Sequence, residues 1–124
     1  MSRLLPLLLL VGCVPVTVDP NLPSIQTEIF TKTCTIGSSC HSSYGLAGDM
    51  DLSEGNSYAN LVNVEADEVE DMVRVVPGDA EASALYQLLL GPIPDARQMP
   101  PGSELSQGKI NAIRQWIDDG ALEQ

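Results

Sequence analysis

Apolar side chains recur at helical intervals in four parts of the chain, separated by stretches rich in glycine, serine and proline. In the first part, residues 24–32, this spacing predicts a helix with Ile25, Ile29 and Phe30 on its inward face. A second, short helix is expected around residues 56–62. Both are amphipathic segments that need a partner to cover their apolar side.

Two further helices are predicted in the C-terminal half. Asp79 can cap the third helix and Gly91 ends it, whereas Ser106 can cap the fourth, with Gly120 as its expected stop. The expected inward residues are Ala82, Leu85, Leu88 and Leu89 in the third helix and Ile110, Ile113, Trp116 and Ile117 in the fourth. No long run of alternating residues predicts a sheet, so the fold class is all-α, a small domain of about four helices with long loops.

Two of these loops contain the residues with the most distinctive chemistry. The first begins at Cys34 and holds Cys40 and the only histidine of the chain, His41, directly after that cysteine. In the second, Met99 precedes two prolines, which favour extended backbone at the methionine and stiffen the loop. Long loops in a small domain usually need something to order them. A Cys-His pair with a downstream Met-Pro is what a covalently attached haem with His and Met axial ligands requires.

The N-terminal residues show the layout of an export signal. A single basic residue is followed by a leucine-rich run and by Gly12-Cys13, and the apolar run is too short to span a bilayer. Its end resembles the lipobox of bacterial lipoproteins, which implies cleavage before Cys13 and lipidation of that cysteine. An ordinary signal peptide and a buried apolar helix are the alternatives.

The resulting organisation has three parts. Residues 1–12 are expected to form the lipoprotein signal peptide, and residues 13–23, with three prolines, the lipidated cysteine and an extended tether. The domain follows at residues 24–124. The chain would then be held at the cell envelope by its lipid anchor only. Val14 is not the Asp associated with inner-membrane retention in enteric lipoproteins, so the outer membrane is favoured, with the domain facing the periplasm or the cell surface.

Composition narrows the function classes. At 124 residues the chain holds one small domain, and its formal net charge of −11 disfavours nucleic acid as a partner. Only five aromatic residues are available for a core, so a disulfide, metal or cofactor is expected to add stability. The run at residues 65–71 contains five acidic side chains and is expected to be a solvated face or a docking patch for a basic protein.

Taken in this order, the motifs resemble the c-type cytochrome-like domains of bacterial exported lipoproteins, over most of residues 25–121. The matching stretches are Ile29-Phe30, Cys40-His41, Gly45-Leu46, Met50 to Ser53, Val75 to Asp79, Ser83 with Leu85, Met99-Pro100-Pro101, Leu105, Ile113, Trp116-Ile117 and Gly120-Ala121. The resemblance implies one covalent haem c, with Cys34 and Cys40 as thioether links and His41 and Met99 as the axial ligands of the iron.

That ligand set leaves no open coordination position for a substrate. The implied role is therefore electron transfer to or from a redox protein, which the acidic surface would suit if the partner is basic, and not catalysis. The haem is expected to lie near Phe30, Leu85 and Trp116 and to complete the core. Arg74 and Arg97 are candidates to pair with its propionates, and ion pairs with surface acids are the alternative.

The spacing of the two cysteines departs from the usual haem motif. Five residues separate Cys34 from Cys40, where the usual motif has about two. The flexible residues 37–39 can loop out the additional length. The same spacing also suits a Cys34–Cys40 disulfide, which is favoured outside the cytoplasm.

The alternative function is therefore a haem-free, disulfide-stapled acidic lipoprotein that acts as a protein-interaction module. A zinc site would lack a fourth ligand, and a hydrolase triad would lack a nucleophile elbow.

Overall fold

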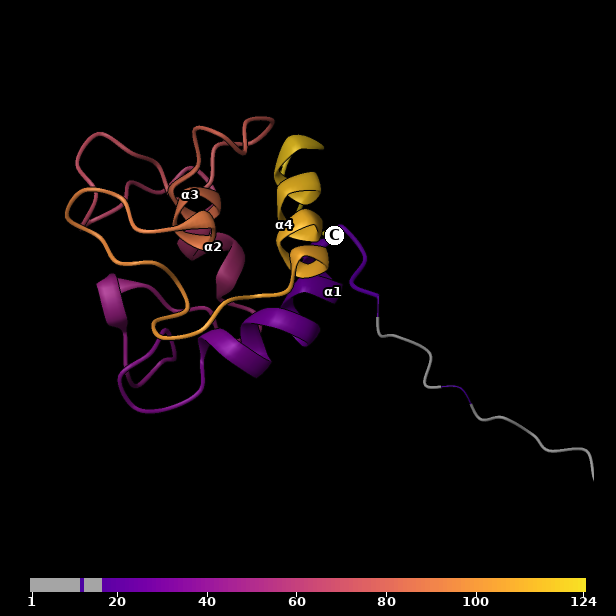
Figure 1. The fold of residues 1–124 in the computed structure, drawn as a ribbon, viewed down its shortest axis with the longest axis horizontal. Coiled ribbons are helices and arrows are strands. Elements are labelled where there is room, and N and C mark those ends of the chain that lie inside the picture. Colours follow the sequence, from indigo (N-terminus) through magenta and orange to yellow (C-terminus); the bar gives the residue numbers. More distant parts are fainter. Residues whose placement is uncertain (1–11, 13–16) are drawn as a thin grey trace, which may run out of the picture.

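A computed structural model describes residue 12 and residues 17–124 of the chain. Its helical elements are, in chain order, α1 (Leu22–Ile25), η1 (Gln26–Cys34), η2 (Ala47–Asp49), α2 (Ser57–Leu61), α3 (Ala84–Leu90) and α4 (Gln107–Asp118), as drawn in Figure 1. The described residues form isolated β-bridges but no strand. The all-α prediction is confirmed. The expected lipidation site Cys13 and the signal peptide, apart from Gly12, lie outside the described residues.

The first predicted helix is confirmed, and it is longer than the sequence pattern indicated. α1 and η1 run on without a break from Leu22 to Cys34, and the Asn21 side chain caps the start by accepting a hydrogen bond from the Ser24 amide at 2.9 Å. The η1 part is π-helical, and the Thr35 amide still bonds five residues back, to the Phe30 carbonyl at 3.1 Å. The predicted inward residues are all fully buried.

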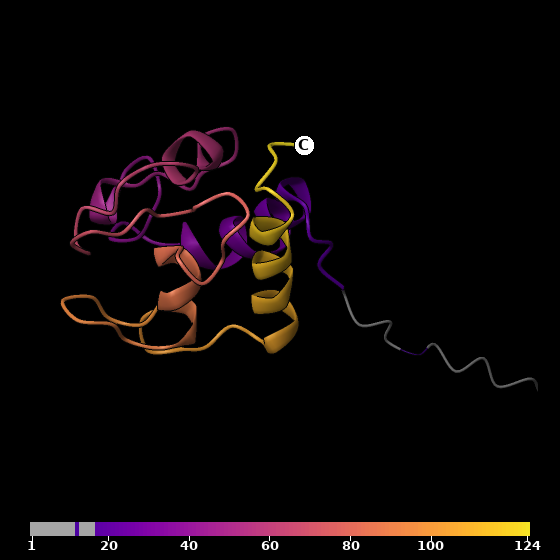
Figure 2. The ribbon, with the colours of Figure 1, turned by 90° about the horizontal axis from the view of Figure 1, so that it is seen from above.

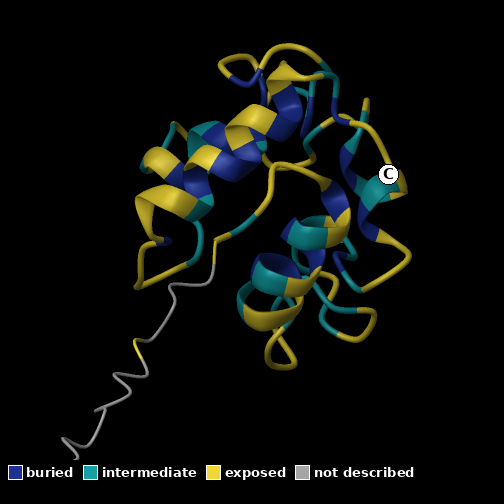
Figure 3. Cartoon of the chain, turned by 90° about the vertical axis from the view of Figure 1, so that its right-hand side faces the viewer, coloured by how far each residue is buried: buried dark blue, intermediate teal, exposed yellow. Residues whose placement is uncertain are grey.

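The last predicted helix is confirmed as well. In α4 the four expected inward residues, Ile110, Ile113, Trp116 and Ile117, are all buried, and the helix packs against α1 and α3. Helices in Figure 3 accordingly show both dark blue and yellow faces. The helix ends at Asp118, and Gly120 follows with a φ of +113°, a backbone conformation that glycine adopts readily. The helical core therefore follows the apolar periodicity of the sequence closely.

The third predicted helix begins later than expected. Asp79 does not cap it; the Asp79 side chain instead accepts from the Ala82 amide at 3.1 Å and closes a turn, and α3 starts after Ser83. The Ser83 hydroxyl holds that turn through bonds of 2.8 Å to the Asp79 carbonyl and the Val76 amide. The buried residues are therefore Ala84, Tyr86 and Leu89, whereas Ala82 is exposed and Leu85 and Leu88 are only half-buried. Gly91 does end the helix.

A buried polar side chain joins the helical core to the rest of the chain. Gln26 donates to the Leu52 carbonyl at 2.9 Å and to the Thr31 hydroxyl at 3.1 Å, and its amide oxygen accepts from Ser57 at 2.6 Å. The second predicted helix is confirmed as α2, which begins at Ser57. Gln26 thereby ties the α2 end of the long segment that leads from η1 to α2 back to the first helix. Within residues 17–124, no helix has the length and apolar character needed to cross a bilayer.

Candidate functional site

The segment between η1 and α2, residues 35–56, is called the Cys–His loop below. Cys34 ends η1, and the His41 amide donates to the Cys34 carbonyl at 3.0 Å, so the chain turns back on itself between them. The structure thus brings the backbone of Cys34 next to that of the Cys40-His41 pair despite the five-residue spacing. Both cysteines are free and half-buried, and the Cys40 sulfur lies 4.0 Å from the position that a Cβ on Gly37 would occupy.

The His41 ring has one of its two nitrogens fixed by the protein. Nδ1 lies 2.8 Å from the carbonyl oxygen of Ala47. Because a carbonyl can only accept, Nδ1 carries the hydrogen and Nε2 is left with its lone pair. Burial lowers the pKa of His41, and the hydrogen bond to Ala47 counteracts part of that effect, so the ring is neutral at pH 7. A neutral imidazole with a free Nε2 and an Nδ1 donor is the form that ligates a metal.

The backbone around the Cys40-His41 unit is tightly packed. A Cβ on Gly45 would lie 2.3 Å from the Cys40 carbonyl oxygen and 2.9 Å from its amide nitrogen, so only glycine fits there. The Ala47 amide donates to the Cys40 carbonyl at 3.2 Å, and the Leu52 amide donates to the His41 carbonyl at 2.7 Å. Since Gln26 anchors Leu52, the position of His41 is tied to the helical core.

Arg74 is not free to pair with a haem propionate, contrary to one of the two expectations for it. Its side chain is buried, and Nη1 donates to the Asn60 carbonyl at 2.8 Å. Nη2 donates to the carbonyls of Gly48 at 2.8 Å and Asp49 at 3.3 Å, and lies 3.4 Å from the Asp67 carboxylate. The guanidinium therefore organises the chain itself, with only one ion-pair partner. Arg97 is exposed, and its role stays a prediction.

Met99, the other predicted axial ligand, lies on a separate loop between α3 and α4. It is half-buried, and its amide donates to the Leu88 carbonyl at 2.9 Å, which ties the loop to α3. In Figure 2 this loop and the part of the Cys–His loop around η2 are two separate arms on the same side of the molecule, away from α4. The pairing of Met99 with His41 across one iron stays a prediction.

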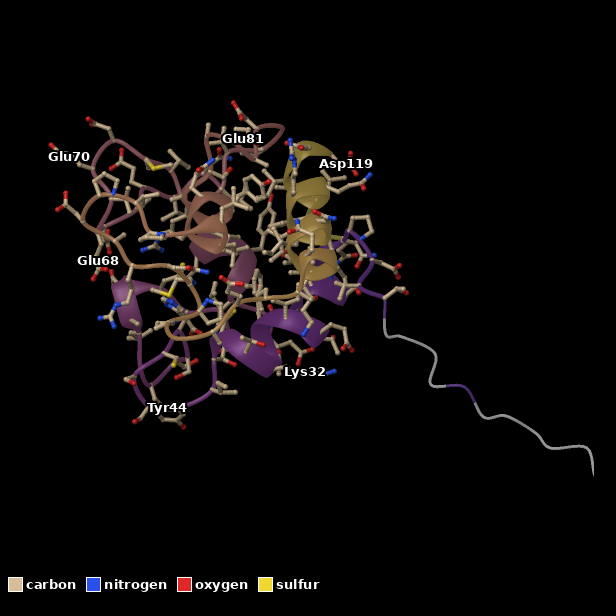
Figure 4. The ribbon with its side chains drawn as sticks, in the orientation of Figure 1. Lys32, Tyr44, Glu68, Glu70, Glu81 and Asp119 are labelled. Carbon is tan, nitrogen blue, oxygen red and sulfur yellow. The ribbon has the colours of Figure 1, made fainter. Side chains whose placement is uncertain are left out.

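Apolar exposure is concentrated in the Cys–His loop. Three of the five large apolar side chains that are exposed among the described residues lie there: Ile36 is 58% exposed, Tyr44 95% and Leu46 45%. Figure 4 shows Tyr44 at the outer edge of the molecule. Phe30 and Trp116, which were expected beside the haem, are both buried, and the Trp116 indole donates to the Leu122 carbonyl at 2.8 Å.

The hollow in this loop is lined mainly by hydroxyl-bearing residues, and the His41 ring is not part of its lining. It has a volume of about 480 Å³ and is lined by Thr35, Gly37, Ser38, Ser42, Ser43, Tyr44 and Ser53. Neither cysteine, nor His41, nor Met99 is among the lining residues.

The Cys34 thiol is poorly suited to act as a thiolate. Burial, together with the neighbouring Cys40, raises the pKa of Cys34 to about 12. Metal-binding and nucleophilic cysteines need a lowered pKa instead. Among the described residues, no three His, Cys, Asp or Glu side chains gather into a group that could hold a metal ion. The geometry therefore gives no support to the zinc interpretation.

Sequence reasoning missed the roles of the residues that support the predicted ligands, although it named Arg74 for another role and Gly45 within a matching stretch. Ala47 offers only its carbonyl, which no side-chain pattern reveals. Arg74 carried a signal, because it is a single charged residue within an apolar stretch. Gly45 carried a weaker one, as a glycine close to the Cys-His pair. No family model, no curated protein and no solved structure matches the chain, so the case for the site rests on its own geometry.

Proposed function

We propose that the chain is a lipid-anchored, single-haem, c-type cytochrome-like electron carrier at the bacterial cell envelope. The observation that carries the proposal is the His41 ring. Its Nδ1 donates to the Ala47 carbonyl at 2.8 Å, which leaves Nε2 available for a ligand, and both Cys40, the residue before it, and Cys34 are free. This is the arrangement in which a histidine ligand is oriented by its second nitrogen.

Four side chains would hold the cofactor. Cys34 and Cys40 would bind the porphyrin edge through thioether bonds, and His41 Nε2 and the Met99 sulfur would be the axial ligands. A haem held in this way supplies one-electron redox chemistry. The role of the protein is to keep the imidazole oriented, through Ala47 and through the His41 backbone bonds to Cys34 and Leu52. With both axial positions filled by side chains, the function is electron carriage and not substrate turnover.

The acidic surface supports a basic redox protein as the partner. All five acidic side chains of residues 65–71 are exposed, and Figure 4 shows Glu68 and Glu70 at the outer edge of the molecule. The charge of Glu68 has the smallest of the effects on the pKa of His41, which it raises, so the patch acts on the proposed redox site through its charge. Complementary charge would speed encounter and would be weakened by salt. Contact with the membrane would be through a lipid on Cys13.

The test is to export the full chain in a host with haem-attachment machinery and to purify it in detergent. We expect a sharp reduced α-band and a haem that remains attached in a denatured pyridine haemochrome assay. His41→Ala should abolish the low-spin spectrum. Met99→Ala should keep the covalent haem, lower its reduction potential and open a coordination position. A wild-type chain without covalent haem would overturn the proposal.

A second function is favoured by one observation. The backbone bond between His41 and Cys34 brings both cysteines to the mouth of one small loop, and the Cys40 thiol is near enough to affect the pKa of Cys34. Oxidation would staple that loop and leave a haem-free acidic lipoprotein for protein interaction. Mass spectrometry separates the two functions, because a disulfide removes about two hydrogens whereas haem adds a whole porphyrin.

A further inference from the structure

Arg74 is buried in an unusual way for a charged side chain. It is 7% exposed, yet its one carboxylate partner, Asp67, lies 3.4 Å away with a side chain that is 53% exposed. Buried charges are usually paired or fully hydrogen-bonded. Here the guanidinium is compensated mainly by three backbone carbonyls, one at the end of α2 and two in η2. A planar fork with several fixed donors can span these two elements at once.

The element that Arg74 holds has a strained backbone. Leu46, Gly48 and Asp49 all have positive φ angles, of 45°, 62° and 51°. Leucine adopts the left-handed region only at a cost. η2 is one short turn, so it cannot stabilise these conformations by itself. The bonds from Arg74 to the Gly48 and Asp49 carbonyls supply the restraint from outside.

The same element begins at Ala47, whose carbonyl accepts from His41 Nδ1. We propose that Arg74 is a positioning residue for His41: by clamping η2 it aims the Ala47 carbonyl at Nδ1 and thereby keeps Nε2 as the atom that faces a ligand. The proposal rests on the proposed function for its purpose, since an oriented Nε2 matters only if something binds it. None of the hydrogen bonds of Arg74 reaches the imidazole, so it positions the ring through the backbone. Its charge also lowers the pKa of His41 directly, an effect that a lysine at this position would keep.

The test uses the fact that the chain has one histidine, so labelling histidine with ¹⁵N gives the signals of His41 alone. The full chain is prepared haem-free and reduced in detergent at pH 8, and two-bond ¹⁵N–¹H correlation spectra report which ring nitrogen is protonated. We expect the wild type to show the Nδ1–H tautomer. Arg74→Lys keeps the positive charge but cannot donate to α2 and η2 at the same time. We therefore expect it to shift His41 toward the Nε2–H form.

Arg114→Lys is the matched control. Arg114 is exposed, stacks on Tyr86 and pairs with Glu81 and Asp118, all remote from η2, so this change should leave the tautomer as in the wild type. The haem-loaded proteins add a second readout. A ligand that loses its Nδ1 hydrogen bond is a weaker electron donor, so Arg74→Lys should raise the reduction potential and weaken axial ligation by about 10-fold or more, whereas Arg114→Lys should do neither.

The outcomes separate the two proposals. If the wild-type chain shows mainly the Nε2–H tautomer, the proposed role of Arg74 is overturned. This result needs no variant, so the test still works if Arg74→Lys fails to fold. If Arg74→Lys keeps both the tautomer and the potential of the wild type, Arg74 is only a structural residue. If the wild type shows the Nδ1–H tautomer and Arg74→Lys loses it, but no covalent haem forms in the exported chain, the clamp is supported and the proposed function fails.

Discussion

The helical core and the Cys–His loop are stabilised in different ways. In the helical core, formed by α1, η1, α3 and α4, apolar side chains such as Ile29 and Ile113 are fully buried against one another. In the Cys–His loop, apolar Ile36 and Leu46 are exposed and only Leu52 is fully buried in the core. The remaining order comes from hydrogen bonds among backbone groups and a few polar side chains. Apolar packing depends on area and has little directionality, whereas each hydrogen bond requires particular atoms.

The difference suits the two regions to different tasks. A packed core stabilises the fold, while a hydrogen-bonded loop can hold a ring nitrogen at a defined position. Two polar side chains restrain the loop: Gln26 joins it to η1 of the core, and Arg74 joins its η2 turn to α2. This contrast between a packed core and a hydrogen-bonded loop can be tested by substitutions that should affect one region and leave the other intact.

The largest effect is expected from the same substitution made in both regions. Ile113→Ala in α4 removes a side chain with no exposure and should lower the free energy of unfolding by about 2–5 kcal/mol. Ile36→Ala in the Cys–His loop removes one that is 58% exposed and should change it by no more than about 0.5 kcal/mol. Urea unfolding followed by the fluorescence of Trp116, the one tryptophan, measures both. Equal losses of unfolding free energy in the two variants would contradict the contrast between the packed core and the loop.

A smaller but local effect is expected from Gly45→Ala. The new Cβ would clash with the Cys40 carbonyl at 2.3 Å, and relieving such overpacking costs about 1–3 kcal/mol. Amide hydrogen exchange should show loss of protection at His41, Ala47 and Leu52, whose amides donate within this loop, while α4 stays protected.

Gly108→Ala is the control for that change. Gly108 lies in α4 with no atom within 4 Å of a new Cβ, so the substitution should be neutral or stabilise the helix by at most about 1 kcal/mol. Uniform loss of protection in the Gly45→Ala variant, in α4 as well as in the loop, would show that the two regions unfold together.

The sequence predicted the helical core far better than the loop. Spacing alone placed Ile25, Ile29 and Phe30 inside, because helix burial follows the 3.6-residue period. It failed at α3, where the bonds of Ser83 stabilise a turn that competes with the helix after Asp79. In the site, residue chemistry pointed to Cys34, Cys40 and His41. The partner of His41 could not be foreseen, because every residue carries a backbone carbonyl and only the folded path of η2 selects that of Ala47.

The last prediction involves no change in stability and concerns only the rates at which two cysteines react. Cys34 lies at the end of the helical core, and Cys40 lies in the Cys–His loop. Cys34 belongs to η1 and packs against the core, and its pKa is raised to about 12 from 9.0, so at pH 8 its thiolate fraction falls by about three orders of magnitude. In the haem-free reduced full chain, iodoacetamide should therefore modify Cys34 much more slowly than Cys40, and the Cys34 rate should keep rising as the pH increases beyond 9. Peptide mapping by mass spectrometry separates both from Cys13, and the urea-unfolded chain is the control in which both should react alike. Equal rates in the folded chain would show that the end of η1 opens as readily as the loop, and the boundary between the two regions would then lie before Cys34.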